Sequence, residues 1–182
     1  MSAAAFRTVA VAGVDAELRG FEDVMRQYER LVLGTALRLV GSLPDAQDVS
    51  QEVFLRLYKN LGKVEERNLP GWLYRVTVNA CHDLRRRRPA SVSVEDAPEL
   101  VSGEADPQRQ TTEAERRRVL EMSLRMLSEK ERAALVLRDL EGLSTEEVAR
   151  VLGSSEATVR SQISKARVKV KDFVERYFRV KR

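Results

Sequence analysis

The chain has 182 residues, of which 43% are hydrophobic, 5% aromatic and 33% charged, and its net charge is +4. This length can hold one ordinary domain or two small ones, and so few aromatic and so many charged residues suit small helical domains with modest cores. Because Cys81 is the single cysteine, an intramolecular disulfide is excluded, and no apolar run approaches the ~18 residues of a membrane span. The composition favours a cytoplasmic protein that does not insert into a membrane.

The charges are distributed unevenly. Residues 156–182 contain nine Lys or Arg against three Asp or Glu, whereas residues 89–115 contain one Arg against seven acidic residues. A basic C-terminal segment of this kind indicates a nucleic-acid partner. Residues 89–111 hold three of the five prolines and no apolar periodicity, so they are predicted to be a flexible linker between two helical domains, residues 17–88 and 112–182. Residues 1–16 carry no convincing export signal and are predicted to be a mobile extension.

A helix is predicted over residues 21–40, where apolar residues recur at spacings of three and four, and a second over residues 45–61. Asp45, Asp48 and Glu52 form a stripe beside the apolar face of the second helix. The helix dipole favours acidic residues near a helix start. An enzyme that uses these carboxylates with a metal is the weakest hypothesis, because no second helix with Glu-x-x-His spacing complements them. The pattern favours a surface that docks on a basic partner.

The third predicted helix, residues 70–88, carries a polar stripe opposite its apolar side. Arg, Asn and His side chains hydrogen-bond base edges and phosphates, and an aromatic ring at the helix start could stack on an unpaired base or belong to the core. The arginine run at the end of the helix either contacts nucleic acid or complements the dipole. Cys81 is expected to be a small buried core residue, and whether Cys81 or His82 senses anything stays open. The stripe consists of Arg75, Asn79, His82 and Arg86, the aromatic residues at the helix start are Trp72 and Tyr74, and the arginine run is Arg85, Arg86, Arg87 and Arg88.

Two short helices predicted in the second domain form a helix-turn-helix. Ser144 and Glu147 have capping-box spacing, Gly153 suits the left-handed end of a helix, and Ser155 can cap the next one. The second helix of such a motif usually enters the DNA major groove. Its apolar stripe includes Val159, and about a quarter turn away lies a polar stripe of Arg160, Ser164, Arg167 and Lys171. A solvated basic helix on an αα-hairpin is the plainer alternative.

The sequence therefore predicts an all-α protein of two small helical domains joined by a flexible acidic linker. No Gly-rich phosphate loop, zinc-type Cys/His spacing or nucleophile elbow occurs in it. We accordingly expect no enzymatic activity and no cofactor.

Three segments in this order resemble a known family. They read DAQDVSQEVFLRLYKNL, PGWLYRVTVNACHDLRRRR and, after the proline-containing linker, LSEKERAALVLRDLEGLSTEEVARVLGSSEATVRSQISKAR. This order is similar to that of the two domains of bacterial RNA polymerase sigma factors of the extracytoplasmic-function (ECF) group. The resemblance covers residues 21–178 and implies a sigma region 2-like domain followed by a sigma region 4-like domain.

The resemblance also implies a role for each of three surfaces. The acidic helix would bind core RNA polymerase, the third helix and the loop before it would recognise and melt the minus-10 promoter element, and the helix-turn-helix would read the minus-35 element as duplex. The implied polymerase-binding residues are Asp45, Asp48, Gln51 and Glu52. The implied minus-10 residues are Lys63, Arg67, Trp72, Arg75, Asn79, Arg85, Arg86, Arg87 and Arg88. The implied minus-35 residues are Ser155, Glu156, Thr158, Arg160, Ser161, Ser164, Arg167 and Lys171.

By the same resemblance, an anti-sigma factor is an expected partner besides core polymerase and promoter DNA. The alternative is a stand-alone helix-turn-helix regulator, which would bind its operator without polymerase. The promoter sequence and the inducing signal stay open.

Overall fold

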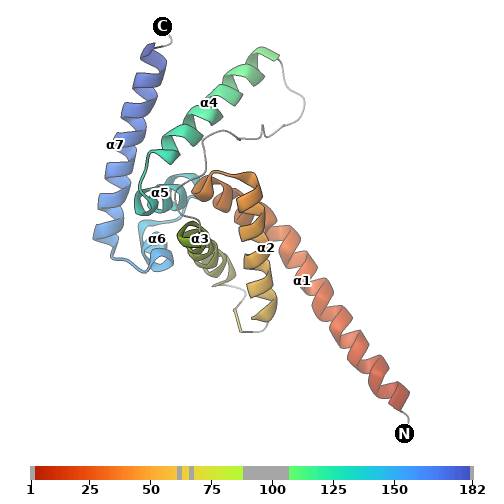
Figure 1. Cartoon of the computed structure of the whole chain (residues 1–182). Coiled ribbons are helices and arrows are strands. Elements are labelled where there is room, and N and C mark those ends of the chain that lie inside the picture. Colours follow the sequence, from red (N-terminus) through yellow and green to blue (C-terminus); the bar gives the residue numbers. More distant parts are fainter. Residues whose placement is uncertain (1–2, 61–62, 66–67, 88–106, 181–182) are drawn as a thin grey trace.

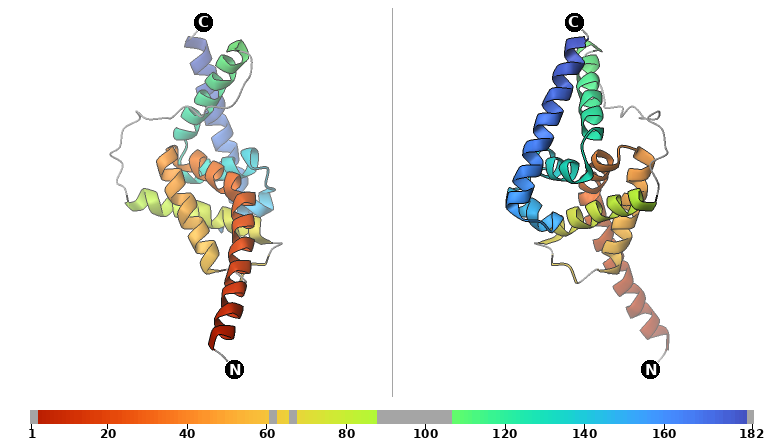
Figure 2. Two further views of the ribbon diagram at one scale, coloured as in Figure 1. Left: turned by 90° about the vertical axis from the view of Figure 1, so that its right-hand side faces the viewer. Right: turned by 60° about the vertical axis from the view of Figure 1, so that its left-hand side comes forward.

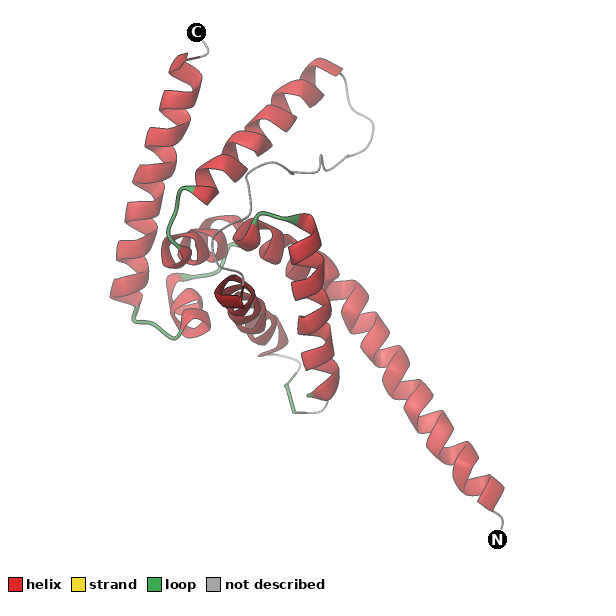
Figure 3. Ribbon diagram, in the orientation of Figure 1, coloured by secondary structure: helices red, strands yellow, loops and turns green. Residues whose placement is uncertain are grey.

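Every regular element in the described part of the chain is helical (Figures 1 and 3). The structure is a computed structural model that describes residues 3–60, 63–65, 68–87 and 107–180, and the side chains among them from residue 20 onward except those of residues 107–112. The elements are α1 (Ala3–Val40), α2 (Leu43–Lys59), α3 (Leu69–Arg87), α4 (Pro107–Arg125), α5 (Glu129–Leu135), η2 (Val136–Leu140), α6 (Thr145–Leu152) and α7 (Glu156–Val180). The predicted all-α class is confirmed.

Helices α1, α2 and α3 pack on one another to form the N-terminal half. Val32, Val53 and Leu73, one from each helix, are fully buried at its centre. The turn between α1 and α2 contains Gly41, whose φ of +76° lies in the left-handed region, and Pro44 lies in the first turn of α2, where its missing N–H has no partner to lose. The residues that the periodicity of α1 and α2 assigned to the core thus face inward.

The C-terminal half contains the predicted helix-turn-helix. At the start of α6, Ser144 Oγ accepts a hydrogen bond from the Glu147 backbone N–H at 3.1 Å, and the Glu147 carboxylate accepts one from the Ser144 N–H at 2.7 Å. The hydrogen bond from the Ser144 N–H holds the pKa of Glu147 below its usual range, because it favours the charged carboxylate. Gly153 ends α6 with a φ of +59°, and Ser155 Oγ accepts the Thr158 N–H at 3.2 Å where α7 begins. The motif forms at the predicted residues.

A second capping box, between Ser128 and Glu131, starts α5. Lys169 of α7 donates to both carboxylate oxygens of Glu131 at 2.8 Å. This bond and the Ser128 N–H hold the pKa of Glu131 below its usual range. Helix α5 runs directly into the π-helical turn η2, which the sequence did not predict, and α7 packs against α4, α5 and α6.

The two halves also pack on each other. Helix α3 lies against α6, and η2 contacts α1 (Figure 2). The buried apolar residues of both halves form one continuous cluster, from Val32 to Ala166. The sequence predicted two domains without this contact.

The predicted domain boundaries stay predictions. Most of the predicted linker, residues 89–106, lies outside the described residues, and α4 begins at Pro107, inside the predicted linker. Helix α1 begins at Ala3. Its N-terminal part, where the sequence predicted a mobile extension over residues 1–16, extends away from the other helices (Figure 1). The mobility of residues 1–16 stays a prediction.

The described residues contain neither a membrane-spanning helix nor a cluster of metal ligands. None of these helices is both long and apolar enough to cross a membrane. No group of three or more His, Cys, Asp or Glu side chains among them could hold a metal ion, and Asp45, Asp48 and Glu52 make no such group.

The backbone of Gly153 gives a test of the helix-turn-helix. A Cβ built at Gly153 meets no atom within 4 Å, so Gly153→Ala should suffer only from the left-handed conformation and lower the free energy of unfolding by about 1–2 kcal/mol. Gly20, inside α1, also has open space around it but no positive φ, so Gly20→Ala should raise that free energy by up to ~1 kcal/mol. Chemical denaturation of both variants measures the difference. Equal stability of Gly153→Ala and the wild type would contradict the assigned turn.

Candidate functional site

The first candidate surface is the α2 face, which we define as Asp45, Asp48, Gln51, Glu52 and Leu55. These residues recur at helical spacing opposite the buried side of α2, and Asp48, Gln51 and Leu55 are exposed. The structure therefore brings together the four residues that the sequence predicted for polymerase binding.

The acidic residues of the α2 face differ in their surroundings. Glu52 accepts a hydrogen bond from Arg56, which also lies 3.8 Å from an Asp83 oxygen on α3. Glu52 thus takes part in a charge network that joins α2 to α3. The Asp48 side chain points to solvent instead.

Sequence reasoning missed the apolar part of this surface. Leu55 is 59% exposed and Tyr58 is 46% exposed. The Tyr58 ring packs edge-on against Phe21 of α1, with ring centroids 5.3 Å apart. Leu55 follows the exposed Asp48 by seven residues and so lies on the same, polar side of α2. An apolar residue there adds nothing to the stability of the helix, and this position was the signal in the sequence for a binding surface. A mixed acidic and apolar face of this kind is suited to binding a protein.

The second candidate surface is the α3 surface, which we define as Trp72, Arg75, Asn79 and the arginines at the end of α3. Asn79 is exposed, and Trp72 is half-buried against the core, so its ring is only partly available for stacking. Arg75 is exposed, and its Nη2 donates to the Arg150 carbonyl of α6 at 2.6 Å. His82 is half-buried on the same side of the helix.

The arginines at the end of α3 differ in their hydrogen-bond partners and in their exposure. Arg85 donates to the Leu39 carbonyl at 3.1 Å, and Arg86 pairs with Asp83 on its own helix. Arg87 is exposed, as is Lys63 in the preceding loop. Two predicted minus-10 residues, Arg67 and Arg88, lie outside the described residues.

Two groups near the α3 surface have raised pKa values. Cys81 is buried in the core, as expected, and this burial raises the pKa of its thiol to about 12. Burial also raises the pKa of Tyr74, and the neighbouring Glu141 carboxylate, which accepts the Tyr74 hydroxyl at 3.2 Å, adds to the effect.

The third candidate surface is the α7 recognition face, which contains the residues predicted to read the minus-35 element. Val159, Ile163 and Ala166 are buried under α7, and the polar stripe faces solvent. All eight predicted residues are exposed: Ser155, Glu156, Thr158, Arg160, Ser161, Ser164, Arg167 and Lys171.

Two arginines of this face have carboxylate partners in the chain. Arg160 pairs with Glu156 at 2.9 Å, one turn earlier in α7. Arg167 donates two hydrogen bonds to Asp139 of η2, at 2.9 and 2.6 Å, and these bonds raise its pKa. Exposed pairs of this kind are worth at most about 1 kcal/mol, so a phosphate could replace the carboxylate at little cost.

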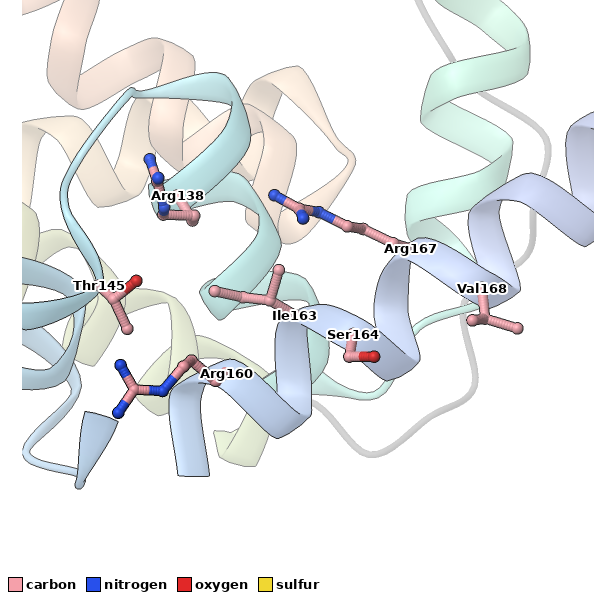
Figure 4. Close-up of a pocket in the computed structure, with 7 residues that line it drawn as sticks. All are labelled: Arg138, Thr145, Arg160, Ile163, Ser164, Arg167 and Val168. Atoms are coloured by element: carbon pink, nitrogen blue, oxygen red, sulfur yellow. The ribbon is translucent and has the colours of Figure 1, made fainter. Parts of the chain in front are cut away.

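An open cleft of about 380 Å³ lies beside the α7 recognition face (Figure 4). Arg138 and Thr145 line it together with Arg160, Ser164 and Arg167. Arg138 comes from η2 and Thr145 from the first turn of α6, and sequence reasoning missed both because neither lies on the periodic stripe of α7. Three guanidinium groups and two hydroxyls around one hollow can bind an anion such as a DNA phosphate.

Both halves of the chain match models of known protein families. Residues 24–90 match the model described as Sigma-70 region 2, and residues 117–170 match the one described as Sigma-70, region 4. The first match contains the α2 face and the α3 surface, and the second contains the α7 recognition face.

Curated relatives support the same assignment over most of the chain. The sigma-H factor of Pseudomonas aeruginosa is 35% identical over 82% of this chain and 83% of its own length. The ECF sigma-E factor of Escherichia coli is 32% identical over 86% of this chain and 87% of its own length. The ECF sigma factor SigE of Mycolicibacterium smegmatis is 32% identical over 91% of this chain, but this chain spans only 65% of that relative.

Solved structures agree on the fold. The sigma factor RpoE of Bartonella quintana, determined in complex with the anti-sigma factor NepR, superposes with a TM-score of 0.70 over 86% of this chain and 98% of its own, at 22% identity. CnrH, determined in complex with the cytosolic domain of CnrY, superposes with a TM-score of 0.63 over 93% of this chain and 96% of its own, at 26% identity. Because the similarity extends over both halves, a stand-alone helix-turn-helix regulator is not favoured. The chain belongs to the extracytoplasmic-function group of RNA polymerase sigma factors, which act in transcription initiation.

Proposed function

We propose that this sigma factor divides its work among the three surfaces. The α2 face binds core RNA polymerase, the α3 surface opens the minus-10 element, and the α7 recognition face reads the minus-35 element as duplex. The observation that supports the proposal most directly is that the two sides of α7 differ in character. Its apolar side is buried, whereas Arg160, Ser164 and Arg167 are exposed beside a cleft lined by arginines. Such a helix can enter a major groove without unfolding its own domain.

Opening of the minus-10 element by the α3 surface would rest on binding energy alone. Stacking of an unpaired base on an aromatic side chain is worth about 1–3 kcal/mol, which is comparable to the few kcal/mol needed to unstack and unpair it. Asn79 is exposed to bind a base edge, and Arg87 is exposed to bind a phosphate. On this proposal the protein is not an enzyme, needs no cofactor and acts in the cytoplasm, where polymerase and promoter meet.

Binding of core polymerase through the α2 face would place the two DNA-binding surfaces on one assembly. Once one promoter element is bound, binding of the second element is intramolecular. For a short flexible connection, the effective concentration of the second DNA-binding surface then rises to the millimolar range. A promoter with both elements would thus be selected over one with a single element.

We also propose an anti-sigma factor as a partner. The support comes from the two similar structures, RpoE with NepR and CnrH with the cytosolic domain of CnrY. Which protein serves this chain is open.

Run-off transcription from a library of random upstream sequences tests the function as a whole. Core polymerase alone should give no specific transcripts, and core polymerase with this protein should give transcripts whose templates share two spaced elements. If core polymerase gains nothing while the protein alone retains specific duplexes, the chain works as a regulator and the proposal is wrong. The same experiment identifies the recognised sequence.

The α2 face is tested by Leu55→Ser. Full burial of a leucine is worth about 1.5–3 kcal/mol, so the variant should bind core polymerase at least about tenfold more weakly. Leu55 is 59% exposed in the free chain, so the thermal stability of the Leu55→Ser variant should equal that of the wild type. Val180→Ser, at an even more exposed apolar residue on the far end of α7, is the matched control and should bind like the wild type. Full retention of affinity by both Leu55→Ser and Asp48→Ala would remove the α2 face from the polymerase interface.

The α7 recognition face is tested by Arg160→Ala in the holoenzyme, with a duplex that carries only the upstream element. Each lost phosphate contact should reduce the slope of log K against log salt concentration by about 1, since fewer counterions are released on binding. Arg179→Ala removes an exposed arginine from the other end of α7 and should leave that slope unchanged. An equal slope for Arg160→Ala and wild type would take Arg160 out of the DNA interface.

A further inference from the structure

A row of alternating charges crosses from α2 to α3. On α2, Arg56 Nη2 lies 2.5 Å from Glu52 Oε1, one turn earlier in the helix. The same Nη2 lies 3.8 Å from Asp83 Oδ2 on α3, and Arg86 donates a hydrogen bond to Asp83 Oδ1. The row therefore runs from Glu52 through Arg56 and Asp83 to Arg86, and its charges alternate between negative and positive.

The two ends of this row belong to two different candidate surfaces. Glu52 is part of the α2 face, and Arg86 is one of the arginines of the α3 surface. Arg56 and Asp83, in the middle, belong to neither. Oppositely charged residues three or four positions apart pair readily on one helix, but the contact between Arg56 and Asp83 joins two helices that pack on each other. The row thus links the two surfaces within the N-terminal half.

Arg56 bonds one of its two carboxylates and only attracts the other. Its separation from Asp83 exceeds the length of a charge-assisted hydrogen bond, about 2.8 Å, whereas it bonds Glu52 directly. A shift of the guanidinium by about 1 Å toward α3 would turn the attraction to Asp83 into a hydrogen bond. Because the Arg56 and Asp83 side chains are 37% and 30% exposed, water screens this interaction without abolishing it.

The position of Arg56 affects how firmly Asp83 holds Arg86. A carboxylate that pairs with a second cation attracts the first one less strongly, because the two positive charges repel each other. The Arg86 side chain is 79% exposed, so a phosphate can reach it from solvent and replace Asp83. A closer approach of Arg56 to Asp83 therefore favours binding of a phosphate by Arg86.

A cation that binds Glu52 would have the same effect from the opposite end of the row. It competes with Arg56 for the Glu52 carboxylate, and Arg56 can then turn to Asp83. Such a coupling is reciprocal, so a phosphate on Arg86 also favours binding of a cation by Glu52. Because the pairs are partly exposed, we expect the coupling to change affinities by about threefold rather than by orders of magnitude.

Building on the proposed function, we propose that Arg56 and Asp83 are positioning residues that couple the α2 face to the α3 surface. When a basic group of core polymerase binds Glu52, Arg56 turns to Asp83, and Asp83 releases Arg86 to a phosphate of the minus-10 element. Arg56 and Asp83 themselves contact neither polymerase nor DNA.

The affinity of the holoenzyme for a promoter fork tests the roles of Arg56 and Asp83. The fork carries the non-template minus-10 strand unpaired, core polymerase is saturating, and the ionic strength is low so that exposed charges are weakly screened. Arg56→Ala should bind the fork about threefold more weakly, since Asp83 then holds Arg86 without competition. Arg56→Ala combined with Asp83→Asn should bind like the wild type, because residue 83 has lost the charge that holds Arg86.

Two further backgrounds separate this role from a general loss of positive charge. Lys59→Ala removes an exposed positive charge from the same helix, and Asp83→Asn should change its affinity no more than it changes that of the wild type. In an Arg86→Ala background, Arg56→Ala should have no further effect, because the residue through which it acts is gone. Should Arg56→Ala fail to fold, Arg56→Gln removes the charge and keeps part of the aliphatic stem.

Glu52→Gln in the free chain tests the other end of the row. Loss of the carboxylate charge frees Arg56, as a polymerase cation would, so the variant should bind a single strand with the non-template minus-10 sequence about threefold more tightly than the wild type. Adding Arg56→Ala should abolish this gain. Glu29→Gln removes the same charge from an exposed residue of α1 and should leave the affinity unchanged.

The outcomes distinguish the coupling from the proposed function. An Arg56→Ala holoenzyme that binds the fork like the wild type, or whose loss Asp83→Asn does not restore, would overturn the coupling. Equal single-strand affinities of Glu52→Gln and Glu29→Gln would also contradict it. In both cases, normal run-off transcription by the wild-type holoenzyme would leave the proposed function standing, whereas a wild-type holoenzyme that selects no promoter would overturn the proposed function itself.

Discussion

Each helix of this protein has one apolar stripe to bury, and that constraint determines where the charged residues can work. On α2, α3 and α7 the buried stripe occupies one side, so the polar residues are confined to the opposite side. Because this spacing recurs every turn, each polar side becomes a continuous strip along its helix. Strips of this kind can meet a partner protein or a nucleic acid along several residues at once.

The strength of each intramolecular ion pair on these strips decides whether a ligand such as a phosphate can replace the partner carboxylate. The pairs of Arg160 with Glu156 and of Arg167 with Asp139 lie in water, where an ion pair contributes little to stability. Replacing a carboxylate by a phosphate there costs almost nothing. The bonds of Arg132 to the Leu124 and Leu39 carbonyls are buried, so they order the chain instead. The same residue types thus serve recognition on the surface and architecture at the interface.

The sequence predicts what depends on local spacing. The capping boxes at Ser128 and Ser144, the left-handed Gly153 and the buried stripe of α7 all follow from short-range rules, and all are present. The contact between the halves could not be predicted, because Arg38, Tyr74 and Glu141 are single residues far apart in the chain with no periodic pattern. Leu55 was missed because it is 59% exposed and adds nothing to the core; the sign of it in the sequence was its position seven residues after Asp48, on the polar side of α2.

The polar groups at the interface between the halves differ in how many of their hydrogen-bond partners lie across it. If the halves separate, Arg132 loses the Leu39 carbonyl but keeps those of Leu124, Arg125 and Leu127 in its own half. The Leu39 carbonyl in turn keeps its bond from Arg85 of the same half. Each half also retains its own fully buried valines. Arg132 and the Leu39 carbonyl thus keep hydrogen-bond partners if the halves separate, whereas Glu141 has its two partners, Arg38 and Tyr74, in the other half.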